Sequence, residues 1–198
     1  GMSDTSAVGL TNGQAYHPVH NTWSDMGDMN TGRYNFGLAA MNGDLYAVGG
    51  IDTQFSGERY HNGNWTALES NLTTGRFTFG LAALNGSLYA VGGSAGVGPL
   101  LTTTEVYNTT TGNWTNLGHN LTTGRFMFSL AALNGSLYAA GGIGYLGPLQ
   151  SVERYHSGSW TTLARSMTKT RTYFGLVAMG GKLYAVGGDI AGDVSTGE

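Results

Sequence analysis

The stretch Leu45-Tyr46-Ala47-Val48-Gly49-Gly50 decides the fold, because a close copy of it occurs three more times along the chain. The copies begin at Leu88, Leu137 and Leu183, which lie 43, 49 and 46 residues after the preceding one. A period of roughly 40–50 residues is typical of tandem arrays in which one supersecondary unit is repeated. The chain is therefore expected to be a repeat protein with four related units.

An apolar hairpin opens each unit. In the first unit, residues 36–40 form a small apolar run, Asn42-Gly43 follows, and Leu45–Val48 is apolar again. Asn-Gly between two apolar runs predicts a tight β-hairpin, because both turn residues must adopt positive φ. The unbroken apolarity of Leu45–Val48 indicates a strand that is covered on both faces. We call these strands a and b, and the other units carry the turn at Asn85-Gly86, Asn134-Gly135 and Gly180-Gly181.

Two further short strands follow in each unit. Strand c of the first unit carries Glu58-Arg59-Tyr60, and strand d carries Trp65. The same features recur as Glu105-Val106-Tyr107 with Trp114 and as Glu153-Arg154-Tyr155 with Trp160, while Tyr16 and Trp23 precede the first unit. Four antiparallel strands repeated at this period predict the blades of a radial β-propeller, in which each sheet buries its faces against its neighbours.

This combination of residues resembles the kelch family of β-propellers. The family pattern is an Arg before strand a, a diglycine after strand b, and then a Tyr and a Trp, which are here Arg33, Gly49-Gly50, Tyr60 and Trp65 with their copies. The resemblance implies an all-β propeller of four-stranded antiparallel blades, four per chain. The residues expected to hold the blades together are Gly49, Gly50, Gly92, Gly93, Gly141, Gly142, Gly187, Gly188, Trp23, Trp65, Trp114 and Trp160.

The units are offset from the ends of the sequence. We expect residues 1–12 to be a tag remnant and a lead-in, and residues 13–198 to form the propeller. The repeats are then 33–75, 76–124, 125–170, and 171–198 together with 13–32. As is common in the kelch family, the strand near Trp23 is expected to complete the last blade and to close a monomeric ring. Kelch rings usually have more than four blades, so a head-to-tail ring of two chains and a slice of a longer array remain as alternatives.

The composition limits which classes of partner and which kinds of active site the chain can have. The chain has 198 residues, no Cys, 11 % charged residues and a net charge of −3, with its 9 Lys and Arg spread singly. A Cys-based site is thereby excluded, a nucleic-acid partner is not expected, and no apolar run predicts a membrane span. Seven Asn-x-Ser/Thr sequons and the low charge weakly suggest a cell-surface or extracellular location, although the tripeptide could simply be copied with the repeat.

The connections between strands b and c are expected to hold the binding site. They share one face of the propeller with the d–a connections, and they differ in length and sequence from unit to unit. Variable loops on a rigid repeated frame are where binding residues concentrate. Two of these loops share Gly-Pro-Leu, so we expect Pro99, Leu100, Tyr145 and Pro148 to contact a partner. The alternative is that these side chains pack on one another.

Four arginines are the other candidate ligand-binding residues: Arg33, Arg76, Arg125 and Arg171. The kelch resemblance implies that they could line the central mouth and pair with acidic groups of a ligand, which suits the bidentate geometry of Arg. Because every unit carries the Arg, the alternative is a structural role in which it satisfies backbone carbonyl groups between blades.

The sequence offers few candidate catalytic or metal-binding residues. His17 and His20 lack a third metal ligand nearby in sequence, no nucleophile–base pair stands out, and the Cys of copper-containing kelch oxidases is absent. No catalytic residue, metal or cofactor is therefore predicted. The sequence favours a non-catalytic scaffold that binds a protein or peptide. A carbohydrate-binding or carbohydrate-active surface propeller and a structural module of a longer array are the alternatives.

Overall fold

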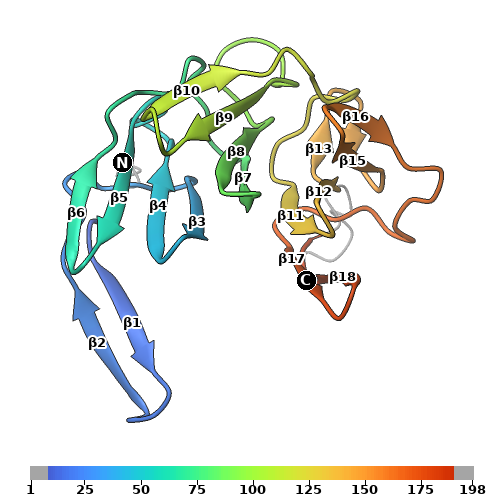
Figure 1. Cartoon of the computed structure of the whole chain (residues 1–198). Helices are drawn as coiled ribbons and strands as arrows, with labels where there is room; N and C mark the ends of the chain where they lie inside the picture. Colours follow the sequence, from blue (N-terminus) through green and yellow to red (C-terminus); the bar gives the residue numbers. More distant parts are fainter. Residues whose placement is uncertain (1–8, 190–198) are drawn as a thin grey trace, which may run out of the picture.

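A computed structural model describes residues 9–189, and this part of the chain contains only β-strands, turns and loops. Three four-stranded antiparallel sheets stand side by side along an arc, with a two-stranded hairpin at either end (Figure 1). The first sheet contains β3 (Gly37–Met41), β4 (Asp44–Val48), β5 (Gly57–His61) and β6 (Asn64–Ala67). The second contains β7 (Gly80–Leu84), β8 (Ser87–Val91), β9 (Thr104–Asn108) and β10 (Asn113–Asn116). The third contains β11 (Ser129–Leu133), β12 (Ser136–Ala140), β15 (Val152–His156) and β16 (Ser159–Thr162).

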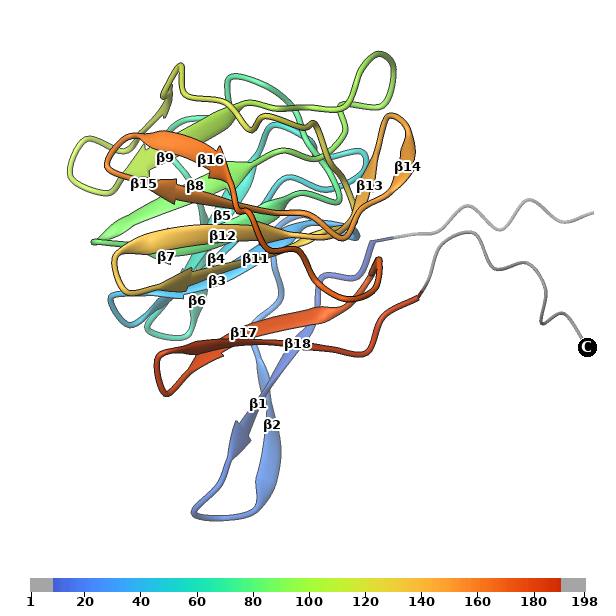
Figure 2. The ribbon, with the colours of Figure 1, turned by 90° about the vertical axis from the view of Figure 1, so that its right-hand side faces the viewer.

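Each sheet is one blade with the predicted strand order a, b, c and d. The a–b hairpins have the predicted tight turns, with φ of 54° at Asn42 and 86° at Gly43 in the first blade. Strand c then adds to the other edge of strand b, as when β5 pairs with β4 in the register Leu45↔Tyr60. Seen from the side, the sheets stack closely upon one another (Figure 2). The core lies between them, where strand b residues such as Leu88 and Leu137 are completely buried.

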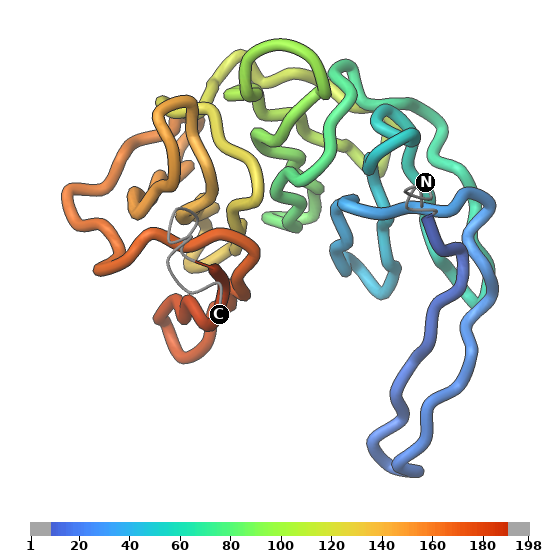
Figure 3. The backbone as a smooth tube through the Cα atoms, turned by 180° about the vertical axis from the view of Figure 1, so that it is seen from behind, coloured from blue at the N-terminus to red at the C-terminus, as the bar shows by residue number. Residues whose placement is uncertain are grey.

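The predicted closure within one chain is not the arrangement found. Strand β2 (Thr22–Met26) pairs with β1 (Gly13–His17), β18 (Lys182–Val186) pairs with β17 (Gly175–Met179), and neither hairpin joins the other. The two hairpins lie at opposite ends of an open arc (Figure 3). Side chains that pack between strand a of one blade and strand a of the next set the rotation between the blades. At this rotation, four units do not complete a turn. The structure thus has three complete blades and two half-blades.

The first propeller residues lie earlier than residue 13. Arg33 donates its backbone N–H to the carbonyl oxygen of Leu10 at 3.1 Å, and Met29 donates to that of Thr11 at 2.9 Å. Residues 10–11, which were assigned to a lead-in, therefore belong to the repeat architecture. Residues 190–198 of the last repeat lie outside the described part of the chain.

The tryptophans of strand d differ in their environment. Trp114 and Trp160 are buried, Trp65 is half-buried, and Trp23 is 67 % exposed. In every case the indole packs on the Tyr of strand c, with ring centroids 5.2 Å apart for Tyr107 and Trp114. Each Trp therefore packs within its own hairpin, but Trp23 has no neighbouring blade in the described structure to cover it.

We expect Trp114→Ala to lower the free energy of unfolding by about 3–5 kcal/mol, because a large buried aromatic is lost and leaves a cavity. Chemical denaturation monitored by far-UV circular dichroism measures this change. The control is Tyr145→Ala, at an aromatic residue that is 90 % exposed, which should cost less than about 1 kcal/mol since an exposed side chain buries little area. Equal losses for the two variants would contradict this packing assignment.

Candidate ligand-binding surface

The geometry that recurs around the repeated arginines is seen clearly at Arg76. Its Nη1 donates to the carbonyl oxygens of Gly92 at 2.9 Å and Thr103 at 3.3 Å. Its Nη2 donates to Oε1 of Glu105 at 2.6 Å. Neither Arg76 nor Glu105 is exposed to solvent. Burial lowers the pKa of the Arg76 guanidinium, and the carboxylate of Glu105 opposes this shift.

The same glutamate also holds the loop that leads into its blade. Glu105 accepts hydrogen bonds from the backbone N–H groups of Thr73 at 2.6 Å and Thr74 at 3.0 Å. We call the buried Arg, the buried Glu and the two loop N–H groups the Arg–Glu clasp. It fixes the d–a connection to strand c and to the end of strand b, and thereby sets where the blade begins. The clasps are Arg33 with Glu58, Arg76 with Glu105, and Arg125 with Glu153.

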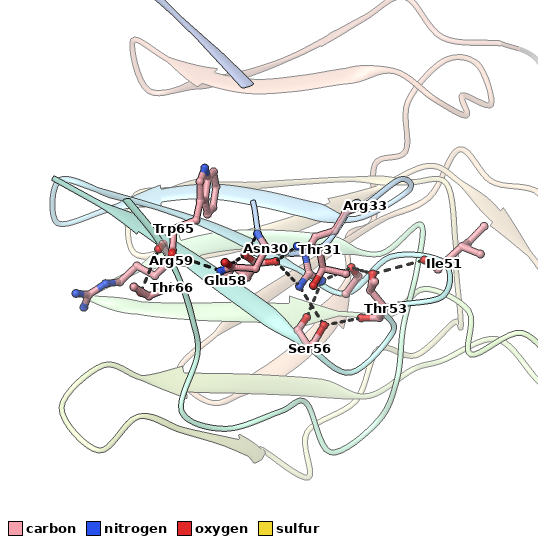
Figure 4. Close-up of polar contacts among 11 residues, drawn as sticks. Asn30, Thr31, Arg33, Ile51, Thr53, Ser56, Glu58, Arg59, Trp65 and Thr66 are labelled. Carbon is pink, nitrogen blue, oxygen red and sulfur yellow. Dashed lines mark hydrogen bonds and ion pairs between the residues drawn. The ribbon is translucent and has the colours of Figure 1, made fainter. Parts of the chain in front are cut away.

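Figure 4 shows the clasp of the first blade. Arg33 reaches Oε1 of Glu58 at 3.1 Å and the backbone oxygen of Ser56 at 3.0 Å. The other side of the Glu58 carboxylate accepts the backbone N–H of Asn30 at 2.7 Å, and Oε1 also accepts that of Thr31 at 3.1 Å. All these partners belong to the chain itself.

These contacts favour the structural alternative over ligand binding for three of the four repeated arginines. Arg33, Arg76 and Arg125 are buried, and their Nη groups are engaged by carbonyl oxygens and a carboxylate. These three arginines thus have the structural role of satisfying backbone carbonyl groups, and each also pairs with a buried glutamate of its own blade. Arg171 is half-buried, and its Nη1 donates to the Gly187 oxygen at 2.5 Å. The glutamate at the matching point of its unit, Glu198, lies outside the described residues.

A surface at the inner rim of the arc was missed by the sequence analysis. Asn35, Thr78, Met127 and Tyr173 occupy equivalent positions two residues after the repeated Arg, and all have φ between 48° and 55°. Their backbones form a relay in which Thr78 N donates to Asn35 O at 2.8 Å, Met127 N to Thr78 O at 3.0 Å, and Tyr173 N to Met127 O at 3.2 Å. Together they line a shallow hollow of about 170 Å³. The available signal was that this position differs in every repeat, whereas the residue that follows it is always Phe.

An apolar groove of about 600 Å³ lies between the b–c loops of the second and third blades. Pro99 and Leu100 come from one loop, and Tyr145, Leu146 and Leu149 come from the other. The second loop is shaped by a small hairpin of β13 (Ile143–Gly144) and β14 (Gly147–Pro148). Tyr145 and Leu146 lie at its tip and are 90 % and 98 % exposed. The structure thus brings Pro99, Leu100 and Tyr145 together, whereas Pro148 is exposed on the same hairpin without lining the groove.

The described residues offer little for metal or acid–base chemistry. Within residues 9–189, no three His, Asp or Glu side chains gather closely enough to hold a metal ion. His61 Nδ1 lies 2.5 Å from Asp44, but this pair is on the a–b and c–d turn side, opposite the groove. The His17 side chain forms a hydrogen bond with the Ser24 hydroxyl, at 2.8 Å, through its Nε2. No helix in this part of the chain could span a membrane.

Comparisons with known proteins agree with this architecture. A family model described as the Kelch motif matches residues 75–119 and 124–167, which cover the second and third units. The second and third units are thus kelch motifs. The chain is also similar to a solved structure titled "Structure of YjhT", with 17 % sequence identity and a TM-score of 0.74. That likeness covers 83 % of this chain and 61 % of the other, so the chain spans less than two thirds of the YjhT structure. No curated protein matches.

Proposed function

We propose that this chain is a non-catalytic scaffold that binds a protein or peptide through the apolar groove between its second and third blades. The observation that carries the proposal is the set of apolar side chains that two b–c loops present to solvent around one groove. An exposed apolar cluster on a rigid frame is typical of an interaction site. The three Arg–Glu clasps make the frame rigid, because they tie both loops of the binding face to the strands below.

The chemistry of the lining favours a peptide over a sugar. Leu100, Leu146, Leu149 and Pro99 offer aliphatic surface, and Tyr145 is the one aromatic residue of the lining. A sugar would place its hydroxyl groups against this surface without partners, at a cost in desolvation free energy. An apolar side chain of a peptide loses nothing in the same position and gains from burial. The groove therefore fits a peptide segment with one or two large apolar residues.

Nearby polar groups are already engaged. The backbone N–H groups of Thr122 and Thr123, which line the groove, donate to Glu153 at 2.6 Å and 3.1 Å. The Thr122 hydroxyl pairs with that of Thr162 at 2.8 Å. These groups hold the wall of the groove in place, so the proposed recognition rests on shape and apolar contact, with no acid, base or nucleophile taking part.

The proposal is tested by selecting peptides from a random display library on the immobilised chain and measuring their affinity by isothermal titration calorimetry. For a groove-binding peptide, Leu146→Ser is expected to weaken Kd by about 10-fold or more, because an interface leucine contributes about 1–3 kcal/mol. The matched control is Val97→Ser, at a residue that is 99 % exposed on the neighbouring loop but does not line the groove. It should leave Kd unchanged.

Two results would overturn the proposed function. One is that no peptide binds the chain with an affinity that depends on Leu146. The other is that selected peptides lose affinity on Met127→Ser, at the inner rim of the arc, and keep it on Leu146→Ser. The second result would move the binding site to the hollow near the axis.

A further inference from the structure

The hairpins at the two ends of the arc are complementary halves of one blade. In β1–β2, Tyr16 pairs with Trp23, and their ring centroids are 5.3 Å apart, as in the c–d hairpin Tyr60–Trp65. In β17–β18, Ala178 pairs with Leu183, in the same register as an a–b hairpin. One end of the chain therefore carries strands c and d, and the other carries strands a and b.

The N-terminal hairpin is fixed at the outer position of a preceding blade. The hydrogen bonds from Arg33 N to Leu10 O and from Met29 N to Thr11 O have equivalents between the first and second blades. There, Arg76 N donates to Gln54 O and Leu72 N donates to Phe55 O, both at 2.9 Å. Strand c of the first blade, β5, begins two residues after Phe55, and β5 and β6 lie at the outside of the arc (Figure 1). The hairpin β1–β2 is anchored in the same way, with no a–b hairpin among the described residues beside it.

The C-terminal hairpin lacks contacts that the complete blades make. A methyl group placed on Gly49 would lie 2.5 Å from the carbonyl oxygen of Arg76 in the next blade, and Gly50 N donates to that oxygen at 3.1 Å. Among residues 9–189, no atom lies within 4 Å of the same position on Gly187, and Gly188 N has no acceptor. The matching carbonyl at the other end of the arc belongs to Arg33.

Strand a repeats this complementarity in its side chains. A methyl group on Gly37 would lie 2.5 Å from Cβ of Leu81, because the next blade presses against this glycine. At Gly175, the equivalent residue of β17, the Val186 oxygen of its own hairpin, at 3.8 Å, is the one described atom within 4 Å of that position. Leu38, the equivalent of Leu81 at the other end, is 56 % exposed. The N-terminal end of the arc thus exposes the Leu38 side chain, and the C-terminal end has open space at Gly175 that can receive it.

The backbone relay at the inner rim ends in the same way. It begins at Asn35, whose N–H has no described partner, and it stops at Tyr173, whose carbonyl oxygen has no described partner. A hydrogen bond between these two groups would continue the relay. The head of the arc, with Asn35 and Leu38, is therefore matched to its tail, with Tyr173, Gly175 and Gly187.

We propose that a second copy of this chain completes the blade. Its β17–β18 hairpin lies inside the β1–β2 hairpin of the first copy, and β18 pairs antiparallel with β1. Equivalence with the β4–β5 pair sets the register as Leu183↔Tyr16, Tyr184↔Ala15, Ala185↔Gln14 and Val186↔Gly13. Because each copy has one head and one tail, two copies exchange both hairpins and close an eight-bladed ring. Unpaired strand edges are removed at both ends.

The proposed register brings Gln14 to the place where the clasp of a complete blade has its glutamate. Gln14 now donates to Asp25 at 2.9 Å, and Arg171 on the matching hairpin lacks a described carboxylate partner. In the shared blade, the Gln14 side-chain oxygen accepts from Arg171. Gln14→Glu should complete a fourth clasp between the two copies, so we expect it to lower the dimer dissociation constant.

The mass of the chain in solution tests the proposal, by sedimentation velocity over a series of concentrations. The expected result is a species of twice 20.7 kDa that dissociates on dilution. Leu38→Asp at the head and Gly187→Val at the tail should each abolish it, with an unchanged circular dichroism spectrum. Leu146→Ser, in the groove, is the control and should leave the dimer intact. A monomer at every concentration, an assembly larger than two copies, or a dimer that survives both variants would overturn the proposal.

Mixing the two defective variants gives a sharper result. A Leu38→Asp chain retains a working tail, and a Gly187→Val chain retains a working head. The mixture is expected to regain a dimer held by one shared blade, although neither variant dimerises alone. If the mixture stays monomeric while the wild-type chain dimerises, the interface is not head to tail and the shared blade is wrong.

Discussion

Arg125→Met is expected to lower the free energy of unfolding by about 3–5 kcal/mol, because it leaves the carboxylate of Glu153 buried without its cation. Both side chains are completely buried, and they are 2.7 Å apart. Thermal and urea denaturation of the full chain measure the loss. The matched control is Arg165→Met, because Arg165 is exposed and has no ion-pair partner among the described residues. That change should cost less than about 0.5 kcal/mol.

The double variant Arg125→Met/Glu153→Leu separates the buried charge from the packing. Removing both charges should recover part of the loss, since breaking a buried pair costs more than replacing it with apolar residues. It should not recover all of it, because the N–H groups of Thr122 and Thr123 lose their acceptor. A loss for Arg125→Met no larger than that for Arg165→Met would show that the clasp does not hold the blade.

Gly49→Val is the second change with a large expected effect, a loss of about 2–5 kcal/mol in the free energy of unfolding. Gly49 has φ of 67°, which a β-branched residue adopts only with strain. Its added Cβ would also meet the Arg76 carbonyl oxygen at 2.5 Å and the Phe79 ring at 2.8 Å. Because the first of these atoms is backbone, the neighbouring blade must shift. Gly92→Val should behave similarly but cost less, since the matching carbonyl oxygen would be 3.0 Å away.

Gly86→Val is the control that isolates the strain from the clash. Gly86 also has positive φ, at 77°, but nothing lies within 4 Å of an added Cβ there. It should therefore show the backbone cost alone. If Gly49→Val and Gly86→Val lose the same free energy of unfolding, the diglycine is required by its backbone conformation and not by the next blade.

The sequence predicts the blade well, because its signals are local. Asn42-Gly43 requires one turn geometry, and the apolar run Leu45–Val48 requires cover on both faces, so strands a and b followed directly. The importance of the diglycine was inferred from the kelch resemblance and from its repetition. The structure shows the physical reason, because the Arg76 carbonyl group lies against Gly49 and leaves no room for a side chain. Strand pairing within a unit is thus encoded over a few tens of residues.

The roles of the arginines and the closure depend on contacts that the pattern does not specify. The repeat contains both Arg76 and Glu105, but only the fold brings them to 2.6 Å, and this contact turns a candidate ligand group into a structural one. The rotation between blades depends on packing between units, so the number of units could not show whether one chain closes. The groove residues were predicted because two variable b–c loops share Gly-Pro-Leu and are apolar around it, as at Pro99 and Tyr145. Thr78 and Met127 differ at a single position of the repeat, which is a much weaker signal.

The most direct measurement of the proposed function is methyl NMR of the full chain titrated with a selected peptide. We expect the chemical-shift changes and the nuclear Overhauser contacts to the peptide to be concentrated on the methyl groups of Leu100, Leu146 and Leu149. The methyl group of Met127 at the inner rim should be unaffected. Peptide contacts at Met127, with unchanged chemical shifts for the groove leucines, would contradict the proposed function and place recognition at the axis of the arc.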